Sequence, residues 1–486
     1  MRNIQKYGGT WKFFDSEKTF QGELHIDSDK NFIVLELIIP ASDSNPMPRP
    51  PYKGKIPYIC GTLFSGAKVL LYKCETGKEH TYLLSYTQQI IYSDFAFWGL
   101  EIKSEDEVMF SNVTVDFGEI INWSRLCKYN WDYSSNYGVN LIWEHEDPVN
   151  FKFGDGLLIK FYPVQGSMES NSYSKEIIAR QSVLVDFVYN QPKEIDEILD
   201  DILSIQYLIG LGIDNEVVIE NIKYQHPTIY SEFENKDGSV TKHFLKADLL
   251  FGKGEKKSTA SIRPFKFIFT LRDINDQNIF LNWNNRYSKL KPVLDLYFTV
   301  FSNKITAPEV LFLNLVQALE TFHARFITDD VKDYITRVEK ITYNFGRGNE
   351  NQNQWHDFLL DEHQQNSKKI HLRSRLADLI FAEGILPFWP SSYNKVEYIS
   401  KVVDTRNYYT HYNIEKEEKA LSREELPLVN AELRILLQFH ILKILGFSTD
   451  ELRKKTVEEM NRLNDIKFLQ EGTHEIKERL WVKKRE

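Results

Sequence analysis

The residues best suited to chemistry lie together in one hexapeptide, Arg406-Asn407-Tyr408-Tyr409-Thr410-His411, near the end of a helix predicted over residues 393–411. Positions four apart share a helix face, so Asn407 and His411 are expected on one side, with Asp404 one turn earlier on the same stripe. Arg406 lies about 100° round the helix from Asn407, and its long side chain can reach that face. The segment therefore predicts one polar patch that holds a guanidinium, an amide and an imidazole.

This set of groups suits phosphoryl transfer without a metal. An imidazole moves protons near neutral pH, and a guanidinium neutralises the negative charge that grows on phosphate oxygens. An amide can orient either group. In RNA the ribose 2′-hydroxyl supplies the nucleophile, so the protein need not provide one. An arginine and a histidine on one helix more often form a solvated face or a structural pair, and the spacing alone does not separate these interpretations.

Other kinds of catalytic site find no support in the sequence. There is no HExxH, no pair of CxxC motifs and no GxSxG, so neither a zinc site nor a hydrolase nucleophile is predicted. The formal net charge of the 486-residue chain is −9, whereas proteins that coat nucleic acid are usually basic. An RNA substrate would therefore be held at a local site or by paired subunits, and no metal or cofactor is expected.

The composition indicates a soluble globular protein, with 42% hydrophobic and 27% charged residues. The sequence begins without an apolar leader and has no run of about 18 apolar residues, so we expect neither secretion nor a membrane partner. Three cysteines, Cys60, Cys74 and Cys127, are few for this length. They predict reduced thiols and a cytoplasmic location.

The elements that would position the hexapeptide are helices. From about residue 290, apolar residues recur with the helical period of about 3.6 residues. A capping box, Ser422-Arg423-Glu424-Glu425, should open a long helix that ends at Gly446. Other helices are predicted over residues 308–326, 331–343, 371–382 and 393–411. We therefore expect an all-α bundle over residues 290–486.

Residues 1–285 are expected to be β-rich, in two parts, 1–137 and 138–285. Phe20, Gly22, Leu24 and Ile26 alternate with polar residues, which is typical of a half-buried strand. One helix is predicted over residues 192–211, begun by Pro192 and ended by Gly212. The even spacing of the strands favours a sandwich-like or barrel-like arrangement, so the fold class is multidomain α+β. Further strands are predicted at 32–39, 81–86, 110–117, 157–162, 182–189, 243–251 and 265–271.

Two kinds of side chain in the helical region could contact RNA. Tyr409, with its neighbours Tyr408 and Tyr412, could stack on bases, although packing inside the bundle is the more common role for at least two of the three. Lys369 and Arg373 could guide the phosphate backbone, although a run of charges usually forms only a solvated face.

The helical region also resembles a known superfamily. Arg406, Asn407 and His411 are similar to the R-φ-x3-H signature of HEPN domains, in which a polar residue often follows the arginine. The segment 312–323 resembles an early HEPN helix that carries an inward acidic residue, here Glu320. Nearly the whole chain further resembles the ApeA-type anti-phage proteins. That resemblance is carried by Gly9-Thr10-Trp11 and by segments 20–24, 117–123, 290–293 and 373–379.

The resemblance implies a metal-independent endoribonuclease that defends bacteria against phage by cleaving host RNA, with tRNA as the expected substrate. It implies a homodimer or higher oligomer in which two R-x4-H motifs line one cleft. The β-rich region would act as the sensor of a phage-derived trigger or as a restraint. In this scheme Arg406, Asn407 and His411 are catalytic. Glu320 and Asp404 support them, although Glu320 is equally well interpreted as an ordinary surface acid.

Two other interpretations stay open. The chain could be a non-catalytic HEPN module that binds RNA or a nucleotide, with a β-rich region that recognises a phage protein or a ligand. It would then bind without turnover. A carbohydrate-binding or carbohydrate-processing β-sandwich would need a pair of carboxylates, and the sequence does not single out such a pair.

Overall fold

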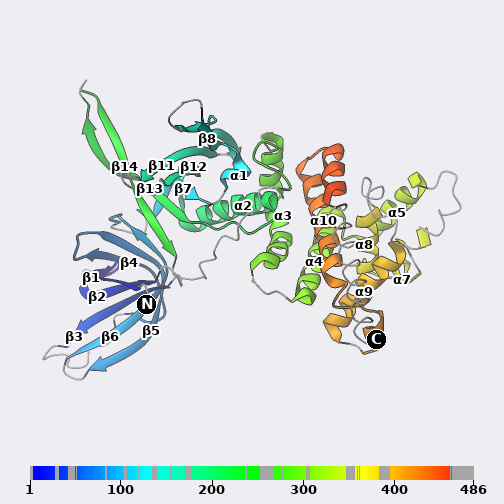
Figure 1. Ribbon diagram of the computed structural model, residues 1–486. Helices are drawn as coiled ribbons and strands as arrows, with labels where there is room; N and C mark the ends of the chain where they lie inside the picture. The colour runs from blue at the N-terminus through cyan, green and yellow to red at the C-terminus, as the bar shows by residue number, and fades with distance from the viewer. Residues whose placement is uncertain are drawn as a thin grey trace, which may run out of the picture. The chain divides into compact units, whose positions relative to one another are not determined.

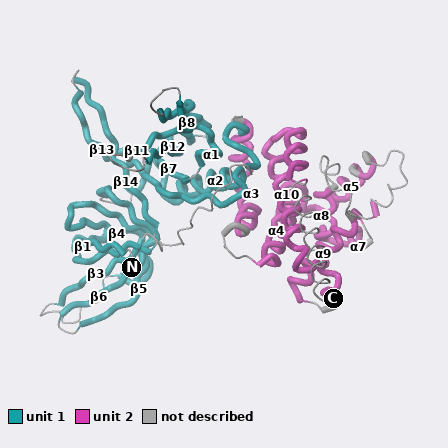
Figure 2. The backbone as a smooth tube through the Cα atoms, viewed as in Figure 1, with its two compact units in different colours: residues 1–275 teal, residues 276–486 magenta. Residues whose placement is uncertain are grey.

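The computed structural model separates the chain into two compact units, residues 1–275 and residues 276–486 (Figure 1, Figure 2). Strands dominate the first unit and helices the second, which confirms the predicted fold class. The described residues are 4–27, 32–41, 50, 52–82, 85–102, 107–118, 120–133, 140–153, 156–169, 178–235, 238–251, 267–274, 277–302, 307–345, 356–357, 359–360, 362–381, 395–412, 414–459, 461 and 463.

Six strands of the first unit close into a barrel. All neighbours are antiparallel in the order β1-β2-β3-β6-β5-β4, and β4 pairs back with β1. Closure removes the exposed edges that an open sheet would present, so the first part of the β-rich region is a barrel rather than a sandwich. The strands are β1 (Ile4–Phe13), β2 (Thr19–Asp27), β3 (Phe32–Pro40), β4 (Lys55–Leu63), β5 (Lys68–Tyr82) and β6 (Tyr86–Trp98).

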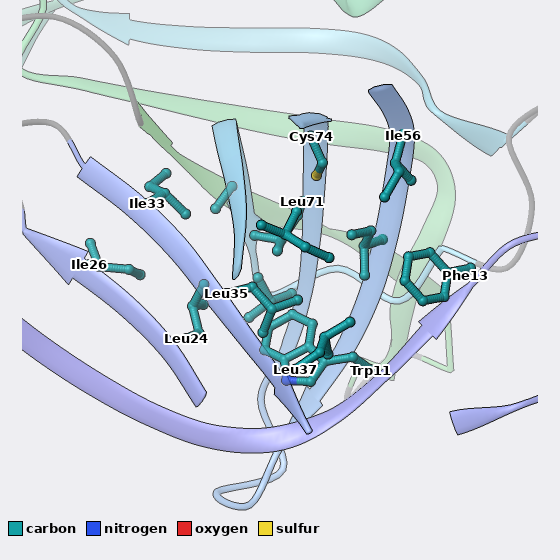
Figure 3. Packing of buried hydrophobic residues seen from close by; sticks show 14 of the residues in the cluster. Trp11, Phe13, Leu24, Ile26, Ile33, Leu35, Leu37, Ile56, Leu71 and Cys74 are labelled. Atoms are coloured by element: carbon teal, nitrogen blue, oxygen red, sulfur yellow. The ribbon is translucent and has the colours of Figure 1, made fainter. Parts of the chain in front are cut away.

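The barrel interior is apolar because every second residue of a strand points to the same face. In β2 the alternate residues Gly22, Leu24 and Ile26 are buried, as the sequence pattern predicts. Trp11 of β1 and Leu35 of β3 join Leu24 and Ile26 in one hydrophobic cluster (Figure 3). This cluster is the core of the barrel.

Trp11 is fully buried and lies against Gly61 of β4. A Cβ atom at residue 61 would lie 2.3 Å from the nearest ring atom of Trp11, far inside van der Waals contact. We expect Gly61→Ala to lower the free energy of unfolding by about 1–3 kcal/mol, the usual cost of overpacking a core. Urea unfolding followed by circular dichroism measures the change.

The matched control is Gly8→Ala in β1. A Cβ atom at residue 8 would meet the ring of Phe64 at 2.7 Å, but that side chain is 74% exposed and can turn aside into solvent. We expect the control to cost less than about 1 kcal/mol. Equal losses of stability in the two variants would contradict the tight contact between Gly61 and Trp11.

The sheet continues beyond the barrel through β14, which pairs with β6. A separate hairpin, β8 (Cys127–Asp132) with β9 (Asn140–His145), follows the short helix α1 (Ile121–Ser124). The helix α2 (Ile195–Ile213) packs against β7 and β12. The added strands of the main sheet, in the order β10-β11-β12-β7-β13-β14, are β7 (Met109–Asp116), β10 (Val149–Phe153), β11 (Leu157–Glu169), β12 (Ile178–Glu194), β13 (Asn221–Glu234) and β14 (Val240–Phe251).

The predicted bounds of the helix over residues 192–211 are wrong at both ends. Pro192 belongs to β12, in a register shift between Val188 and Lys193, and such an irregularity tolerates a proline in a strand. The helix begins only at Ile195 and ends at Ile213, because Asp214 takes the left-handed conformation with φ of 53°. Gly212 serves close packing instead, since a Cβ atom there would lie 2.4 Å from Nε1 of Trp123.

Two predicted strands are also wrong. The strand β5 ends at Tyr82 and β6 begins at Tyr86, its antiparallel partner across the turn, and residues 83–84 of the predicted strand lie outside the described part of the chain. Aromatic and β-branched residues on both sides of this turn conceal it in the sequence. Residues 267–270 form no strand and residues 271–274 form a turn, and the Thr270 amide and hydroxyl both donate to the Asp273 carboxylate. Their apolar side chains, such as Phe269, are buried without strand pairing, and residues 265–266 lie outside the described part of the chain.

The second unit is helical. Its first helix begins at Gln277, before the start of the helical period predicted at about residue 290. The sequence pattern places the start too late because polar residues such as Asn284 and Asn285 and an internal proline, Pro292, weaken the apolar periodicity of this helix. None of the helices in the described ranges is both long and apolar enough to span a membrane. The elements are α3 (Gln277–Ser302), α4 (Pro308–Phe322), the π turn η2 (His323–Ile327), α5 (Val331–Phe345), α7 (Glu362–Gln365), α8 (Leu372–Phe381), α9 (Lys395–His411), η3 (Ile414–Lys419) and α10 (Leu426–Leu445).

The predicted capping box is present before α10. The Ser422 amide donates to Oε2 of Glu425 at 2.8 Å, and the Glu425 amide donates back to the Ser422 hydroxyl at 3.3 Å. At the other end Gly446 takes a φ of 100°, which ends the helix as predicted. The helix α10 packs against α3, α4 and α8 and so forms the centre of the bundle.

Candidate active site

The hexapeptide forms the last turns of α9, which ends at His411. The next residue, Tyr412, takes a left-handed conformation with φ of 48°, and its backbone N–H donates to the Tyr408 carbonyl. This reversal ends the helix. Arg406 and Asn407 are half-buried, whereas His411 is exposed. The imidazole is therefore presented at a helix end.

The structure brings Arg406 and Asn407 into contact, because Nη1 of Arg406 donates to Oδ1 of Asn407 at 3.2 Å. This bond uses one of the five guanidinium N–H groups and leaves others for an anion. His411 lies four residues after Asn407 and so shares its helix face. The His411 side chain forms no hydrogen bond or ion pair with any residue in the described ranges. The site thus combines a guanidinium that is held by a hydrogen bond to Asn407 with an imidazole that is exposed to solvent.

The end of α9 is held by the chain that follows it. Thr405 is fully buried, and its hydroxyl accepts a hydrogen bond from the Leu421 amide at 2.8 Å while it donates to the Lys401 carbonyl at 2.7 Å. Lys401 lies 3.6 Å from Glu425 in the capping box of α10. These bonds fix the helix turn that carries Arg406.

The two predicted supporting residues, as far as the structure describes them, form no side-chain hydrogen bond or ion pair with the three catalytic candidates. Asp404 accepts a hydrogen bond from Lys416 of η3 at 2.6 Å, so its carboxylate fixes the segment after α9. Glu320 is half-buried on α4, a helix that packs against α9. Its side chain forms no hydrogen bond or ion pair with any described residue, Arg406 included.

Three tyrosine rings gather beside His411. The ring centroids of Tyr408 and Tyr409 lie 5.0 Å apart, and the Tyr412 ring lies 5.8 Å from Tyr408 and 6.3 Å from Tyr409. Tyr412 is 69% exposed. Burial raises the pKa of Tyr409, and the nearby Glu309 carboxylate raises it further, so this phenol is neutral at physiological pH. The cluster offers aromatic faces at the helix end where the imidazole is exposed.

The two predicted basic contacts lie near the start of α8. Lys369 is exposed, and its carbonyl accepts hydrogen bonds from Gln364 and Ser367, which fix its backbone. Arg373 is half-buried in the first turn of α8. The helix α8 packs against α9, the helix that carries the hexapeptide.

A buried polar network, which the sequence patterns did not single out, joins η2, α5 and α8. Nε2 of His323 donates to Asp378 at 2.9 Å, and Nε of Arg337 donates to both oxygens of the same carboxylate at 2.8 Å. Nη1 of Arg375 lies 3.1 Å from Nδ1 of His323. A neutral imidazole with its proton on Nε2 satisfies both contacts. His323 begins a π turn, in which the Thr328 amide donates to the His323 carbonyl.

The network is structural rather than catalytic, because His323 and Asp378 are almost completely inaccessible. Burial alone would raise the pKa of Asp378, but the hydrogen bonds from His323 and Arg337 outweigh burial and hold the pKa below its ordinary value. His440 of α10 is also buried, and burial lowers its pKa to about 4. It is therefore neutral, and its Nε2 donates to the Leu379 carbonyl at 3.0 Å. Neither buried histidine can reach a polymeric substrate.

Among the residues that the structure describes, the cysteines and the potential metal ligands add no second site. Cys60, Cys74 and Cys127 are free thiols. Burial raises the pKa of Cys60 and of Cys74 to about 12, so both are protonated and unreactive at neutral pH. Across the described ranges, no group of three or more His, Cys, Asp and Glu side chains could hold a metal ion.

Comparison with known families matches both parts of the chain. A model described as ApeA N-terminal domain 1 matches residues 6–283, and one described as Apea-like HEPN matches residues 313–451. The second match contains Arg406, Asn407 and His411. No curated protein and no solved structure matches the chain.

Proposed function

The chain belongs to the family of ApeA-type proteins with a C-terminal HEPN domain, and on that premise we propose that it is an anti-phage effector that cleaves host RNA, with tRNA as its substrate. One observation carries the proposal. Arg406 is braced by Asn407, and the exposed His411 follows one turn later at the end of α9. Together these three residues supply a cation for a phosphate and a group that transfers protons.

In the proposed reaction His411 takes the proton from a ribose 2′-hydroxyl. The 2′ oxygen attacks the adjacent phosphorus, and the bond from phosphorus to the 5′ oxygen breaks. Arg406 neutralises the charge that grows on the phosphate oxygens, while Asn407 holds the guanidinium through Oδ1. The products are a 2′,3′-cyclic phosphate and a 5′-hydroxyl. No metal enters this scheme.

The leaving 5′ oxygen needs a proton while the 2′ oxygen loses one, so a concerted reaction uses two imidazoles. A second copy of the chain would supply the other His411. Residues 301–486 contain 28 Lys and Arg against 29 Asp and Glu, so the helical unit offers RNA little overall attraction. Pairing two copies of Arg406 would make a local positive site. We therefore include a homodimer in the proposal, with the β-rich region as its control.

The proposal predicts that the purified full-length chain cleaves total RNA in excess EDTA. The initial cleavage rate per chain should rise with protein concentration through the range in which dimers form. Gel electrophoresis of the RNA, with sedimentation analysis at the same protein concentrations, measures both effects. Binding without cleavage would favour the non-catalytic alternative, and cleavage that depends on an added divalent cation would contradict the mechanism.

A further inference from the structure

The first unit contains a cavity of ≈ 720 Å³ that is separate from the barrel core. Residues of α1, β8, β9 and β12 line it, together with Phe267 and Arg272 of the segment 267–274. This volume lies within the range of about 300–1,000 Å³ that small-molecule sites occupy. All of the lining residues belong to one compact unit.

Hydrogen bonds fix the frame of this cavity. The Glu146 amide donates to the Leu126 carbonyl at 2.7 Å, and the Leu271 amide donates to the Trp123 carbonyl at 3.2 Å. On the wall, Nε1 of Trp143 donates to Oε1 of Gln181 at 3.1 Å. Three segments that are far apart in the sequence are thus joined, so the cavity is formed before any ligand binds.

The lining carries more available positive than negative charge. Lys128 pairs with Glu144 at 3.0 Å, and Arg272 pairs with Glu146 at 3.1 Å. All four side chains are about half exposed or more, so these pairs are weak and their cations can rearrange toward an anion. Arg125 is exposed and forms no side-chain hydrogen bond or ion pair with the residues that the structure describes.

Arg125 also holds an unfavourable backbone conformation. Its φ is 56° and its ψ is 28°, the left-handed region that residues with a Cβ atom rarely adopt. Such conformations cluster at binding and catalytic sites. Here the conformation ends α1, and Arg125 is one of the residues that line the cavity.

Aromatic rings complete the lining. Phe267 and the imidazole of His145 both line the cavity, and the His145 ring lies 4.6 Å from the Trp143 ring at an interplanar angle of 32°. Flat rings of this kind stack on planar ligands. Guanidinium groups bind phosphate through two parallel hydrogen bonds.

We propose that this cavity binds a phosphorylated small molecule of nucleotide size, with Arg125 contacting the phosphate. Such a ligand would give the β-rich region a chemical input that does not depend on recognising a protein.

Isothermal titration calorimetry of the full-length chain with pyrophosphate, AMP and ATP tests this assignment. We expect at least one of the three to bind with a Kd below about 100 μM, and Arg125→Gln to weaken that binding at least about tenfold, as loss of a charged hydrogen bond does. Lys78→Gln removes the same charge from an exposed position on β5 that does not line the cavity, and it should leave Kd unchanged. Because no RNA is present, the result is independent of ribonuclease activity.

Citrate, which carries carboxylates but no phosphate, tests whether charge alone is recognised, and it should bind at least about tenfold more weakly. The proposal is overturned if none of the three phosphates binds, if Arg125→Gln binds as the wild type does, or if citrate binds equally well. Should Arg125→Gln shift the melting temperature, Arg272→Gln takes its place, with the same expected loss and the same contradiction.

Discussion

Replacing His411 by alanine is expected to slow RNA cleavage by about 10²- to 10⁴-fold, the usual contribution of a general acid or base. The imidazole is exposed at the end of α9, so its removal leaves no cavity in the bundle. Initial rates on purified tRNA, with the protein in excess EDTA, measure the loss. The melting temperature should stay within about 2 °C of the wild type, as expected for a surface substitution.

Arg406→Ala is expected to cause a loss of similar size, because the guanidinium stabilises charge that develops only in the transition state. Arg406→Lys keeps the positive charge, but an ammonium group cannot donate to Oδ1 of Asn407 and at the same time form two parallel hydrogen bonds to a phosphate. The variant should therefore recover only part of the cleavage rate. Asn407→Ala removes the partner at 3.2 Å. It should slow cleavage by about tenfold, less than the loss of His411 or Arg406, as loss of one hydrogen bond does.

The matched controls are His356→Ala and Arg325→Ala in the same helical unit. His356 pairs with Asp357 at 3.6 Å, and Arg325 is exposed within η2. Neither belongs to the hexapeptide, so both variants should cleave RNA at the wild-type rate. Cleavage at the wild-type rate by both His411→Ala and Arg406→Ala would contradict the assignment of the site.

The second large effect is on stability. Asp378→Asn is expected to lower the free energy of unfolding by about 3 kcal/mol, at the lower end of the 3–5 kcal/mol that follows loss of one partner from a buried ion pair. The lower value applies because the Arg337 side chain is 36% exposed and can be rehydrated. The Asp378 side chain itself is only 1% exposed, and it accepts bonds from both His323 and Arg337. Urea unfolding at pH 7 measures the loss.

The difference in free energy of unfolding between the wild type and Asp378→Asn should also depend on pH. The pKa of Asp378 in the folded state lies below its ordinary value, so its ionised form stabilises the fold. That contribution is complete above the pKa of the unfolded chain, about 4, and is lost as the pH falls through the lower pKa of the folded chain. The stability gap between wild type and Asp378→Asn should therefore be constant from pH 8 to about 5 and shrink below about 4.

Asp333→Asn is the matched control, because Asp333 is exposed in the first turn of α5. Its cost should stay below about 1 kcal/mol. The loss of unfolding free energy in Asp378→Asn could instead be as small as in Asp333→Asn, or could grow as the pH falls below about 4. Either result would show that the buried carboxylate does not stabilise the bundle.

The helix that carries the hexapeptide could be predicted closely from the sequence. Its predicted end, His411, is the observed end of α9, whereas its predicted first two residues, 393–394, lie outside the described part of the chain. Apolar periodicity reports burial directly, which also explains the correct alternation of Leu24 and Ile26 in β2. Barrel closure could not be predicted in this way, because alternation within β1 does not indicate that β4 will pair with it.

Local signals failed where tertiary contacts override them. Pro192 is typical of a first helical turn, yet the structure places it in an irregular part of β12, where pairing with β7 sets the conformation. Gly212 is typical of a helix end, yet contact with Trp123 explains it better. Neither partner can be identified from the neighbouring sequence.

The sequence predicts the positions of the candidate site residues on their helix, but not their contacts. Spacing on one helix places Asn407 and His411 on one face, but it does not reveal that Asn407 binds Arg406 or that Asp404 turns to Lys416. The network around Asp378 could not be found by spacing, because His323 lies 55 residues away from it. Such contacts depend on how η2, α5 and α8 pack, which no single stretch of sequence encodes.

The chemical ends of the cleaved RNA test the role of the hexapeptide most directly. Sequencing of RNA ends from cells that express the wild type or His411→Ala, each with and without phage, identifies both the cleavage positions and their termini. We predict new 5′-hydroxyl and 2′,3′-cyclic phosphate ends in tRNA of infected wild-type cells, and none in cells with the variant. Ends that carry a 5′-phosphate, or equal cleavage with His411→Ala, would contradict catalysis by Arg406, Asn407 and His411.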